Sequence, residues 1–279
     1  MPLITLLTDF GVDDEYVGVM KGVILSINPS AIIVDITHSL EPQDIVQASY
    51  LIKSSYRFFP EKTIHIIVID PGVGTGRSII ALKMMGQIFL APDNGVLAPL
   101  MDDGDMETMV SVENQDFFLK PVSNTFHGRD IFAPVAAYLS NGVGIRRFGP
   151  SMEKAGIVQL SIRKPYISDK GALVGSVISI DRFGNLITNI DIKTIKKFVG
   201  PRVDKKIKIH IGNKLIVPLS ESYEKACPQT PLAIIGSRGY LEIAVNCGNA
   251  KKYFTSEKGD TIKVIIDDFA PVYQAYRST

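Results

Sequence analysis

The sequence lacks several features that define common functional classes. Lys and Arg number 30 against 29 Asp and Glu, so the formal net charge is only +1. Binding to nucleic acid needs a concentrated basic surface, and this balance gives no case for it. No run of about 18 apolar residues is present to predict a membrane span. The stretch 3–11 lacks the basic segment and cleavage site of a signal peptide, so we expect a cytoplasmic protein.

Cysteine and histidine are also scarce. Cys227 and Cys247 belong to no CxxC motif, and we expect both to be reduced, structural thiols. The four histidines are too scattered for a zinc site, so no metal is expected. His65 lies in an apolar run and is interpreted as a core residue, His210 as part of a half-solvated strand. His38 lies in a loop that is either near a pocket or simply capped.

The first part of the chain alternates short apolar runs with helical patterns, which is typical of a parallel sheet covered on both faces. We therefore predict an N-terminal α/β domain over residues 1–165 with a mostly parallel sheet. The expected strands are 3–7, 31–36, 63–70, 78–83 and 87–92. The expected helices are 14–27, with Asp13 as N-cap, 44–59 and 129–139.

The sequence pattern changes after about residue 171, where predicted strands follow one another closely with turn residues between them. This density of strands predicts a smaller C-terminal antiparallel β-barrel domain over residues 172–279. The expected strands are 172–181, 185–190, 205–212, 214–219, 231–237, 240–245 and 260–266.

Polar clusters follow three of the N-terminal strands, at 8–11 (TDFG), 70–77 (DPGVGTGR) and 92–95 (PDNG). Each strand-end Asp alone is better explained by a turn or a helix cap than by a binding role. Because ligands of open α/β sheets bind beyond the carboxyl ends of the strands, the three together predict a polar pocket. The glycine-rich loop matches neither the P-loop nor the dinucleotide-binding pattern. His127, just before a predicted helix, is as well explained by a structural role as by one in this pocket.

Two short bends in the second domain carry polar residues. DRFGN (181–185) places an acid, an aromatic ring and an amide around a glycine, and GSRG (236–239) places a hydroxyl beside a guanidinium. Hairpin turns explain both segments. Together they also offer a carboxylate for an ammonium group and donors for a carboxylate, the groups that a zwitterionic ligand needs.

Six motifs stand in one order along nearly the whole chain: LLTDFG, IDPGVGTGR, APDNG, FHGRDIF, DRFGNLITNI and SRGYLEIA. In this order they resemble the S-adenosylmethionine hydroxide adenosyltransferases, relatives of the bacterial fluorinase and chlorinase. The resemblance implies an N-terminal α/β domain, a C-terminal β-barrel and a homotrimer whose sites lie between subunits.

The resemblance also implies an Asp, Arg and His set that the halogenating relatives lack, here Asp70, Arg77 and His127. It further implies substrate contacts: Asp9 to the ribose hydroxyls, Asp181 to the methionine ammonium, Phe183 and Asn185 to adenine, and Ser237, with Arg238 beside it, to the methionine carboxylate.

The function predicted by this resemblance is attack of water on the ribose 5′ carbon of S-adenosylmethionine, giving adenosine and methionine with no cofactor. Which of Asp70, Arg77 and His127 handles the proton is left open. The nearest alternative is a halogenase of the same family, against which the complete Asp, Arg and His set argues. So does DRFGN, which is one residue shorter than the fluorinase pattern. A second alternative is a sensor that binds S-adenosylmethionine or adenosine without turnover.

Overall fold

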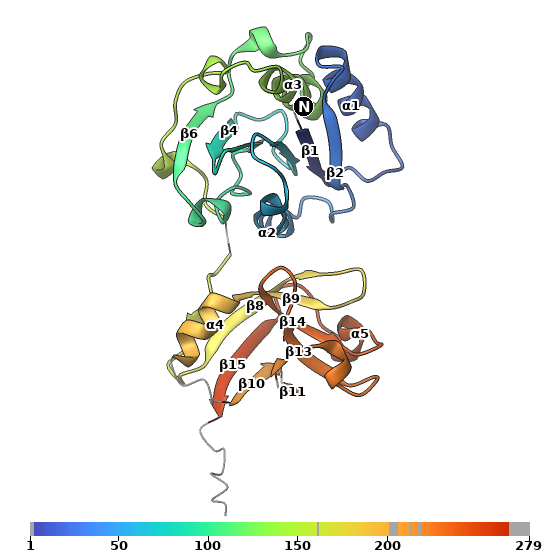
Figure 1. Cartoon of the computed structure of the whole chain (residues 1–279), viewed down its shortest axis with the longest axis vertical. Helices are drawn as coiled ribbons and strands as arrows, with labels where there is room; N and C mark the ends of the chain where they lie inside the picture. The colour runs from blue at the N-terminus through green and yellow to red at the C-terminus, as the bar shows by residue number, and fades with distance from the viewer. Residues whose placement is uncertain (1–2, 161, 201–205, 213, 217–218, 268–279) are drawn as a thin grey trace, which may run out of the picture. The chain divides into compact units, whose positions relative to one another are not determined.

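The computed structural model describes residues 3–160, 162–200, 206–212, 214–216 and 219–267. The chain forms two compact units, Met1–Ile162 and Arg163–Thr279 (Figure 1). Among the described residues, no helix combines the length and the apolar character needed to cross a membrane.

The N-terminal unit is built on a six-stranded sheet in the order β2-β1-β3-β5-β4-β6. Strands β2, β1, β3 and β5 run parallel, and β4 pairs antiparallel with both β5 and β6. The predicted mostly parallel sheet is therefore confirmed. The strands are β1 (Leu3–Thr8), β2 (Ile32–Thr37), β3 (Ile64–Val68), β4 (Ile79–Met84), β5 (Gln87–Pro92) and β6 (Met106–Ser111).

Helices cover both faces of this sheet. Adjacent residues of a strand point to opposite faces, so Leu6 packs in the apolar layer under α1 (Tyr16–Ile27) and α3 (Ala133–Ser140). Leu7 packs in the layer under α2 (Ile45–Ser55). This two-sided burial explains the continuous apolar runs of the central strands β1 and β3.

Two helix starts differ from the predictions. Helix α1 begins at Tyr16 rather than at residue 14, and its N-cap is Glu15, which makes no side-chain capping bond, rather than Asp13. The segment expected as one helix from Arg129 begins with a π-helical turn, Gly128–Phe132, and only then continues as α3. Because π-helical turns leave the regular hydrogen-bond pattern, they are not visible in apolar periodicity.

The helix expected over residues 44–59 is shorter. Helix α2 begins after Asp44, whose carboxylate accepts a hydrogen bond from Gln47 N at 2.8 Å. It ends at Ser55, and a 3-10 turn over Tyr56–Phe58 follows. The expected stop before Pro60 therefore comes one turn early.

The C-terminal unit is a barrel-like sheet, antiparallel as predicted except where β12 pairs parallel with β13. The strand order is β11-β10-β15-β8-β9-β14-β13-β12 with β7 against β8. Its ends approach each other where β11 contacts β13. The strands are β7 (Tyr166–Ile167), β8 (Leu173–Ile180), β9 (Leu186–Asp191), β10 (Lys206–Ile211), β11 (Lys214–Ile216), β12 (Leu219–Ser220), β13 (Pro231–Ile235), β14 (Tyr240–Val245) and β15 (Thr261–Asp267).

Two helices accompany this sheet, α4 (Ile192–Val199) and α5 (Ala250–Phe254). Asp191 caps α4 by accepting a hydrogen bond from Thr194 N at 2.6 Å. The apolar side chains of alternate strand positions, such as Leu186, Ile243 and Val264, fill the interior.

Candidate active site

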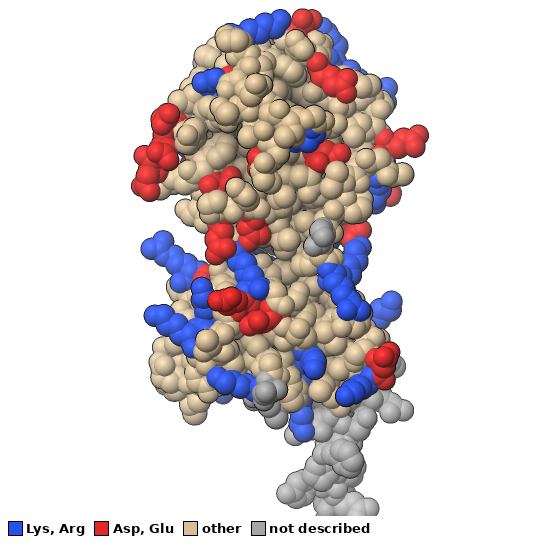
Figure 2. Space-filling view, turned by 180° about the vertical axis from the view of Figure 1, so that it is seen from behind, with Lys and Arg blue, Asp and Glu red and all other residues tan. Residues whose placement is uncertain are grey.

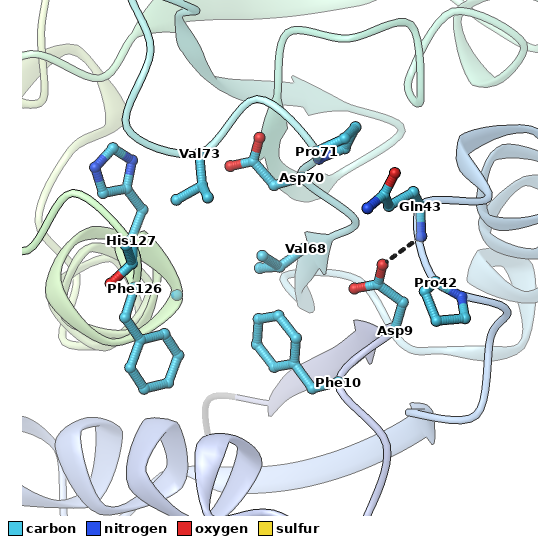
Figure 3. A pocket seen from close by; sticks show the side chains of 12 residues that line it. Asp9, Phe10, Pro42, Gln43, Val68, Asp70, Pro71, Val73, Phe126 and His127 are labelled. Carbon is cyan, nitrogen blue, oxygen red and sulfur yellow. Dashed lines mark hydrogen bonds between the residues drawn. The ribbon is translucent and has the colours of Figure 1, made fainter.

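A pocket of about 290 Å³ lies at the carboxyl ends of β1 and β3 in the N-terminal unit. Asp9 follows β1, Asp70 follows β3 and His127 precedes the π-helical turn, and all three line the pocket. In the view of Figure 3, Asp9 and His127 stand on opposite sides, with Asp70 between them. The structure thus places a polar site at the predicted edge of the sheet.

The loop between Asp70 and Arg77 folds back on itself. Val73 N donates to the carbonyl of Asp70 at 3.2 Å, and Thr75 N donates to that of Gly72 at 3.1 Å. Gly74 has a φ of +76°, and a Cβ atom there would lie 2.2 Å from the carbonyl oxygen of Asn124. Only glycine fits this approach, which brings the loop beside the segment that carries His127.

The fold-back brings three predicted residues into direct contact. Arg77 Nε donates to both carboxylate oxygens of Asp70, at 2.8 and 2.9 Å, and Arg77 Nη2 also pairs with Asp70 Oδ2. The same Nη2 lies 2.8 Å from His127 Nδ1. The side chains of Asp70 and Arg77 are almost buried, with 5% and 11% exposed. The Asp70–Arg77–His127 trio is therefore one connected unit.

The contact with Arg77 determines the protonation of His127. A guanidinium only donates hydrogen bonds, so His127 Nδ1 accepts and the proton of the neutral ring is assigned to Nε2. Burial lowers the pKa of His127 below its ordinary 6.5, and the positive charge of Arg77 lowers it further. The carboxylates of Asp70 and Asp130 oppose this lowering of the pKa. At neutral pH the ring is uncharged and keeps an N–H donor at Nε2.

Asp9 is held by a residue that sequence reasoning missed. Gln43 N donates to Asp9 Oδ2 at 2.7 Å (Figure 3). Phe10 and Phe126 form an apolar wall, with ring centroids 6.0 Å apart. Both aromatic residues stand inside recognised motifs, whereas Gln43 follows an unremarkable EP dipeptide and carries no comparable signal.

The third predicted cluster does not line this pocket. Asp93 Oδ1 accepts a hydrogen bond from Val158 N at 2.9 Å, and Asn94 Nδ2 donates to the carbonyl of Ile69 at 2.8 Å. The two side chains fix neighbouring loops. The prediction that three strand-end clusters converge on one pocket was wrong for this one, because its polar atoms bind main chain.

The first C-terminal bend is organised by Asp181. Its Oδ1 accepts hydrogen bonds from Phe183 N and Asn185 N, both at 2.9 Å, and its Oδ2 accepts from Asn185 Nδ2 at 3.1 Å. Asn185 is buried, whereas Phe183 is 76% exposed. Part of the carboxylate of Asp181 and one amide hydrogen of Asn185 are thus already used within the loop, and the Phe183 ring is free to contact a ligand.

The second bend is the hairpin between β13 and β14. Gly239 N donates to the carbonyl of Gly236 at 2.8 Å, so Ser237 and Arg238 occupy the middle of a four-residue turn. The hairpin interpretation is confirmed, and the substrate contacts assigned to Ser237 and Arg238 stay predictions.

An acid that sequence reasoning missed lies against this turn. Glu242 Oε1 accepts a hydrogen bond from Tyr223 at 2.5 Å, and Oε2 lies 2.4 Å from where a Cβ of Gly236 would be. Burial raises the pKa of Glu242, and the negative charge of Asp181 raises it further. The available signal was an acidic residue in the middle of an apolar strand.

Comparison with known proteins gives a consistent assignment. Residues 4–149 match the model of the SAM hydroxide adenosyltransferase N-terminal domain, and residues 175–263 match that of the C-terminal domain. An (R)-S-adenosyl-L-methionine hydrolase of Thermus thermophilus is 33% identical over 93% of this chain and 98% of its own. A fluorinase of an Actinoplanes species is 29% identical over 94% and 97%.

A solved structure points the same way. A conserved protein of Thermotoga maritima, described as uncharacterized, is 38% identical and superposes with a TM-score of 0.85 over 94% of this chain and 99% of its own. With both domain models matched in order and a relative above 30% identity spanning both units, this chain belongs to the S-adenosylmethionine hydroxide adenosyltransferase family.

Proposed function

We propose that this protein hydrolyses S-adenosylmethionine to adenosine and methionine. The observation that carries the proposal is the Asp70–Arg77–His127 trio, formed as one hydrogen-bonded unit at the pocket. The resemblance assigns this set to the hydrolytic members of the family. The match to relatives named hydrolases supports the same activity.

In the proposed reaction, the oxygen of water bonds to the ribose 5′ carbon while the bond from that carbon to sulfur breaks. The bonding electrons remain on sulfur, which changes from a sulfonium cation to the neutral thioether of methionine. This leaving group needs no acid. The chemical difficulty lies with water, a weak nucleophile that must lose a proton.

The geometry of the trio favours an electrostatic role over proton abstraction by His127. Its Nδ1 lone pair is occupied by Arg77 and its Nε2 carries the ring proton, so neither nitrogen is free to take another. Arg77 and His127 Nε2–H are instead hydrogen-bond donors for a hydroxide-like oxygen, whose proton passes to solvent. Donors fixed in advance at a nearly buried site stabilise developing negative charge strongly.

The remaining site residues are proposed to bind the two ends of the substrate. Asp9 would hold the ribose hydroxyls in the N-terminal pocket. The C-terminal unit would supply Asp181 for the ammonium, Phe183 and Asn185 for adenine, and Ser237 with Arg238 for the carboxylate, as the resemblance implies. We expect no metal requirement.

The net charges of the two units support an assembly in which the N-terminal unit of one copy contacts the C-terminal unit of another. Residues 1–162 carry 11 basic and 18 acidic side chains, whereas residues 163–279 carry 19 basic and 11 acidic ones. On the face shown in Figure 2, Lys and Arg gather on the C-terminal unit. Opposite net charge favours docking of the N-terminal unit of one copy on the C-terminal unit of the next. We propose the homotrimer, with sites between subunits, on this basis and on the family resemblance.

The proposal is tested by chromatography of S-adenosylmethionine incubated with the purified protein. We expect adenosine and methionine in equal amounts, undiminished by a chelator. In the name of the relatives, L specifies the α-carbon, so the descriptor (R) refers to the sulfonium centre. The two sulfonium epimers are therefore assayed separately, and we expect the (R) epimer to react faster. Binding without turnover of either epimer would identify a sensor, and 5′-chloro-5′-deoxyadenosine formed with chloride would identify a halogenase. The cytoplasmic location stays a prediction, which cell fractionation can test.

A further inference from the structure

Two threonines of strand β1 each contact a histidine side chain. Thr5 Oγ1 lies 2.7 Å from His65 Nδ1, and Thr8 Oγ1 lies 2.8 Å from His38 Nδ1. All four residues are buried, with 5% exposure or less. Burying polar groups is costly unless they bind one another, so each pair has to be satisfied by its surroundings.

The Thr5–His65 pair has a structural explanation in the core of the sheet. His65 Nε2 lies 2.8 Å from Gln87 Oε1, and Gln87 Nε2 donates to the main-chain carbonyl of Phe59 at 2.9 Å. This chain of contacts joins β1, β3 and β5 and then ends on main chain. It lies away from the residues that line the pocket.

The Thr8–His38 pair, in contrast, contacts main chain that borders the pocket. Phe10 N donates to Thr8 Oγ1 at 3.3 Å, and Gly11 N donates to the carbonyl of His38 at 2.8 Å. Both bonds hold the main chain immediately after Asp9. The Asp9 side chain is fixed separately by Gln43 N. The position of Asp9 therefore depends on Thr8 and His38 from the core side and on Gln43 from the pocket side.

His38 is itself anchored to a charged pair. Its Nε2 lies 3.1 Å from Asp35 Oδ1, close but not aligned for a good hydrogen bond, and Lys21 Nζ donates to Asp35 Oδ2 at 2.6 Å. The carboxylate of Asp35, which lies within β2, faces this edge of the ring. A series of contacts thus runs from the half-exposed Lys21–Asp35 pair through His38 and Thr8 to the turn that carries Asp9.

We propose that His38 and Thr8 are positioning residues that hold the Asp9–Gly11 turn in the conformation that binds the ribose of the substrate. This inference rests on the proposed function, in which Asp9 contacts the ribose hydroxyls. His38 acts through Thr8, and Thr8 acts through the main chain of Phe10. Neither side chain contacts substrate.

The matched strand positions supply the test and its control. Thr8→Val and Thr5→Val each remove one hydroxyl at nearly constant shape. We expect Thr8→Val to raise KM for S-adenosylmethionine about fivefold, the usual worth of one net hydrogen bond, with kcat near wild type. Thr5→Val should lower the free energy of unfolding and leave KM unchanged. Thr8→Ser restores the hydroxyl and should restore KM.

A double-mutant cycle with Asp9→Asn shows whether Thr8 acts through Asp9. We expect Asp9→Asn to raise KM, and Thr8→Val to add little in that background, because coupled residues are non-additive. His38→Leu is the second variant, with the same expectation, if Thr8→Val folds poorly. Equal rises in KM for Thr8→Val and Thr5→Val, an unchanged KM in Asp9→Asn, or full additivity would overturn the positioning role. Wild-type protein that releases no adenosine would instead contradict the proposed function.

Discussion

The ring of His127 has one nitrogen engaged by Arg77 and the other carrying the proton. A donor role and a proton-acceptor role for this ring make different demands on a replacement. An asparagine amide superposes best on Nδ1, and a glutamine amide reaches the position of Nε2. The pair of substitutions therefore separates the two roles.

We expect His127→Gln to retain much of the turnover, because its amide N–H replaces the Nε2 donor. His127→Asn keeps a partner for Arg77 but loses that donor, and kcat should fall about 100-fold, the usual cost of removing one such donor. KM should change little in either variant. Steady-state kinetics of the two proteins provide the measurement. Equal and nearly complete loss in both would identify His127 as the proton acceptor.

At the scale of elements, the glycine-rich loop after β3 is shaped by one close approach. Gly74 lies against the main chain of Asn124 with a positive φ, whereas a Cβ at Gly76 would meet no atom within 4 Å. The two glycines stand in the same loop, so they form a matched pair. The same substitution has a steric cost at one position and none at the other.

Gly74→Ala should displace the loop and with it the trio. We expect turnover to fall tenfold or more, since displacement of reacting groups by about 1 Å can cost 100-fold in rate. Gly76→Ala should keep near-normal turnover. Turnover and the free energy of unfolding are measured on both variants. Normal turnover in a folded Gly74→Ala protein would show that the loop conformation does not matter for the trio.

His65, in the central strand β3, is buried, and its protonation depends on folding. Burial lowers the pKa of His65 to about 4 from an ordinary 6.5, and its bond to Gln87 opposes this. Between these pH values the unfolded chain binds the proton and the folded chain does not, so stability is lost as pH falls from 6.5 towards 4. A shift of this size corresponds to a loss on the order of 3 kcal/mol.

We expect His65→Gln to be less stable at neutral pH but to lose less stability on acidification. Chemical denaturation of both proteins at a series of pH values measures the free energy of unfolding. The difference between their pH slopes isolates His65 from the carboxylates, which titrate in both. Parallel slopes would mean that His65 is not held neutral by the fold.

Much of the element content was predictable, for a physical reason. Strands buried on both faces or alternating against a barrel interior carry strong apolar patterns, and residues 240–245 match β14 throughout. The sequence did not predict that α1 begins at residue 16, nor that a π-helical turn precedes α3. Helix caps and irregular turns depend on tertiary contacts, which a local pattern does not show.

The site was predictable in part, and mainly through the resemblance. The resemblance carried by the ordered motifs grouped Asp70, Arg77 and His127 as one set, and in the structure these residues are in contact. Gln43 and Glu242 were missed because their partners come from other parts of the chain. Asp93 was wrongly placed in the pocket, because a strand-end aspartate that binds main chain has the same local sequence as one that binds ligand.

At the scale of the whole molecule, the net charge of +1 conceals two units of opposite sign. The residues proposed for the nucleophile precede residue 130, and those proposed for methionine and adenine follow residue 180. If copies associate head to tail in a closed ring, each site combines both sets from different chains. Raised salt should weaken such an association by screening the unlike units.

A mixture of His127→Ala and Asp181→Ala chains tests this arrangement. Random assembly of a shared site should leave about a quarter of sites without a lesion and so recover about a quarter of wild-type activity. Each variant alone should stay at background. The activity of the whole mixture, in which the presence of mixed oligomers is verified, gives the result. Background activity in those oligomers, or a monomer by light scattering, would contradict the shared site.

The central claim is that water attacks the ribose 5′ carbon of S-adenosylmethionine. The most direct test is a reaction in ¹⁸O-water with the purified protein, followed by mass spectrometry of both products. The account predicts one ¹⁸O atom in the 5′-hydroxyl of adenosine and none in methionine. Unlabelled adenosine, or label in methionine instead, would contradict it.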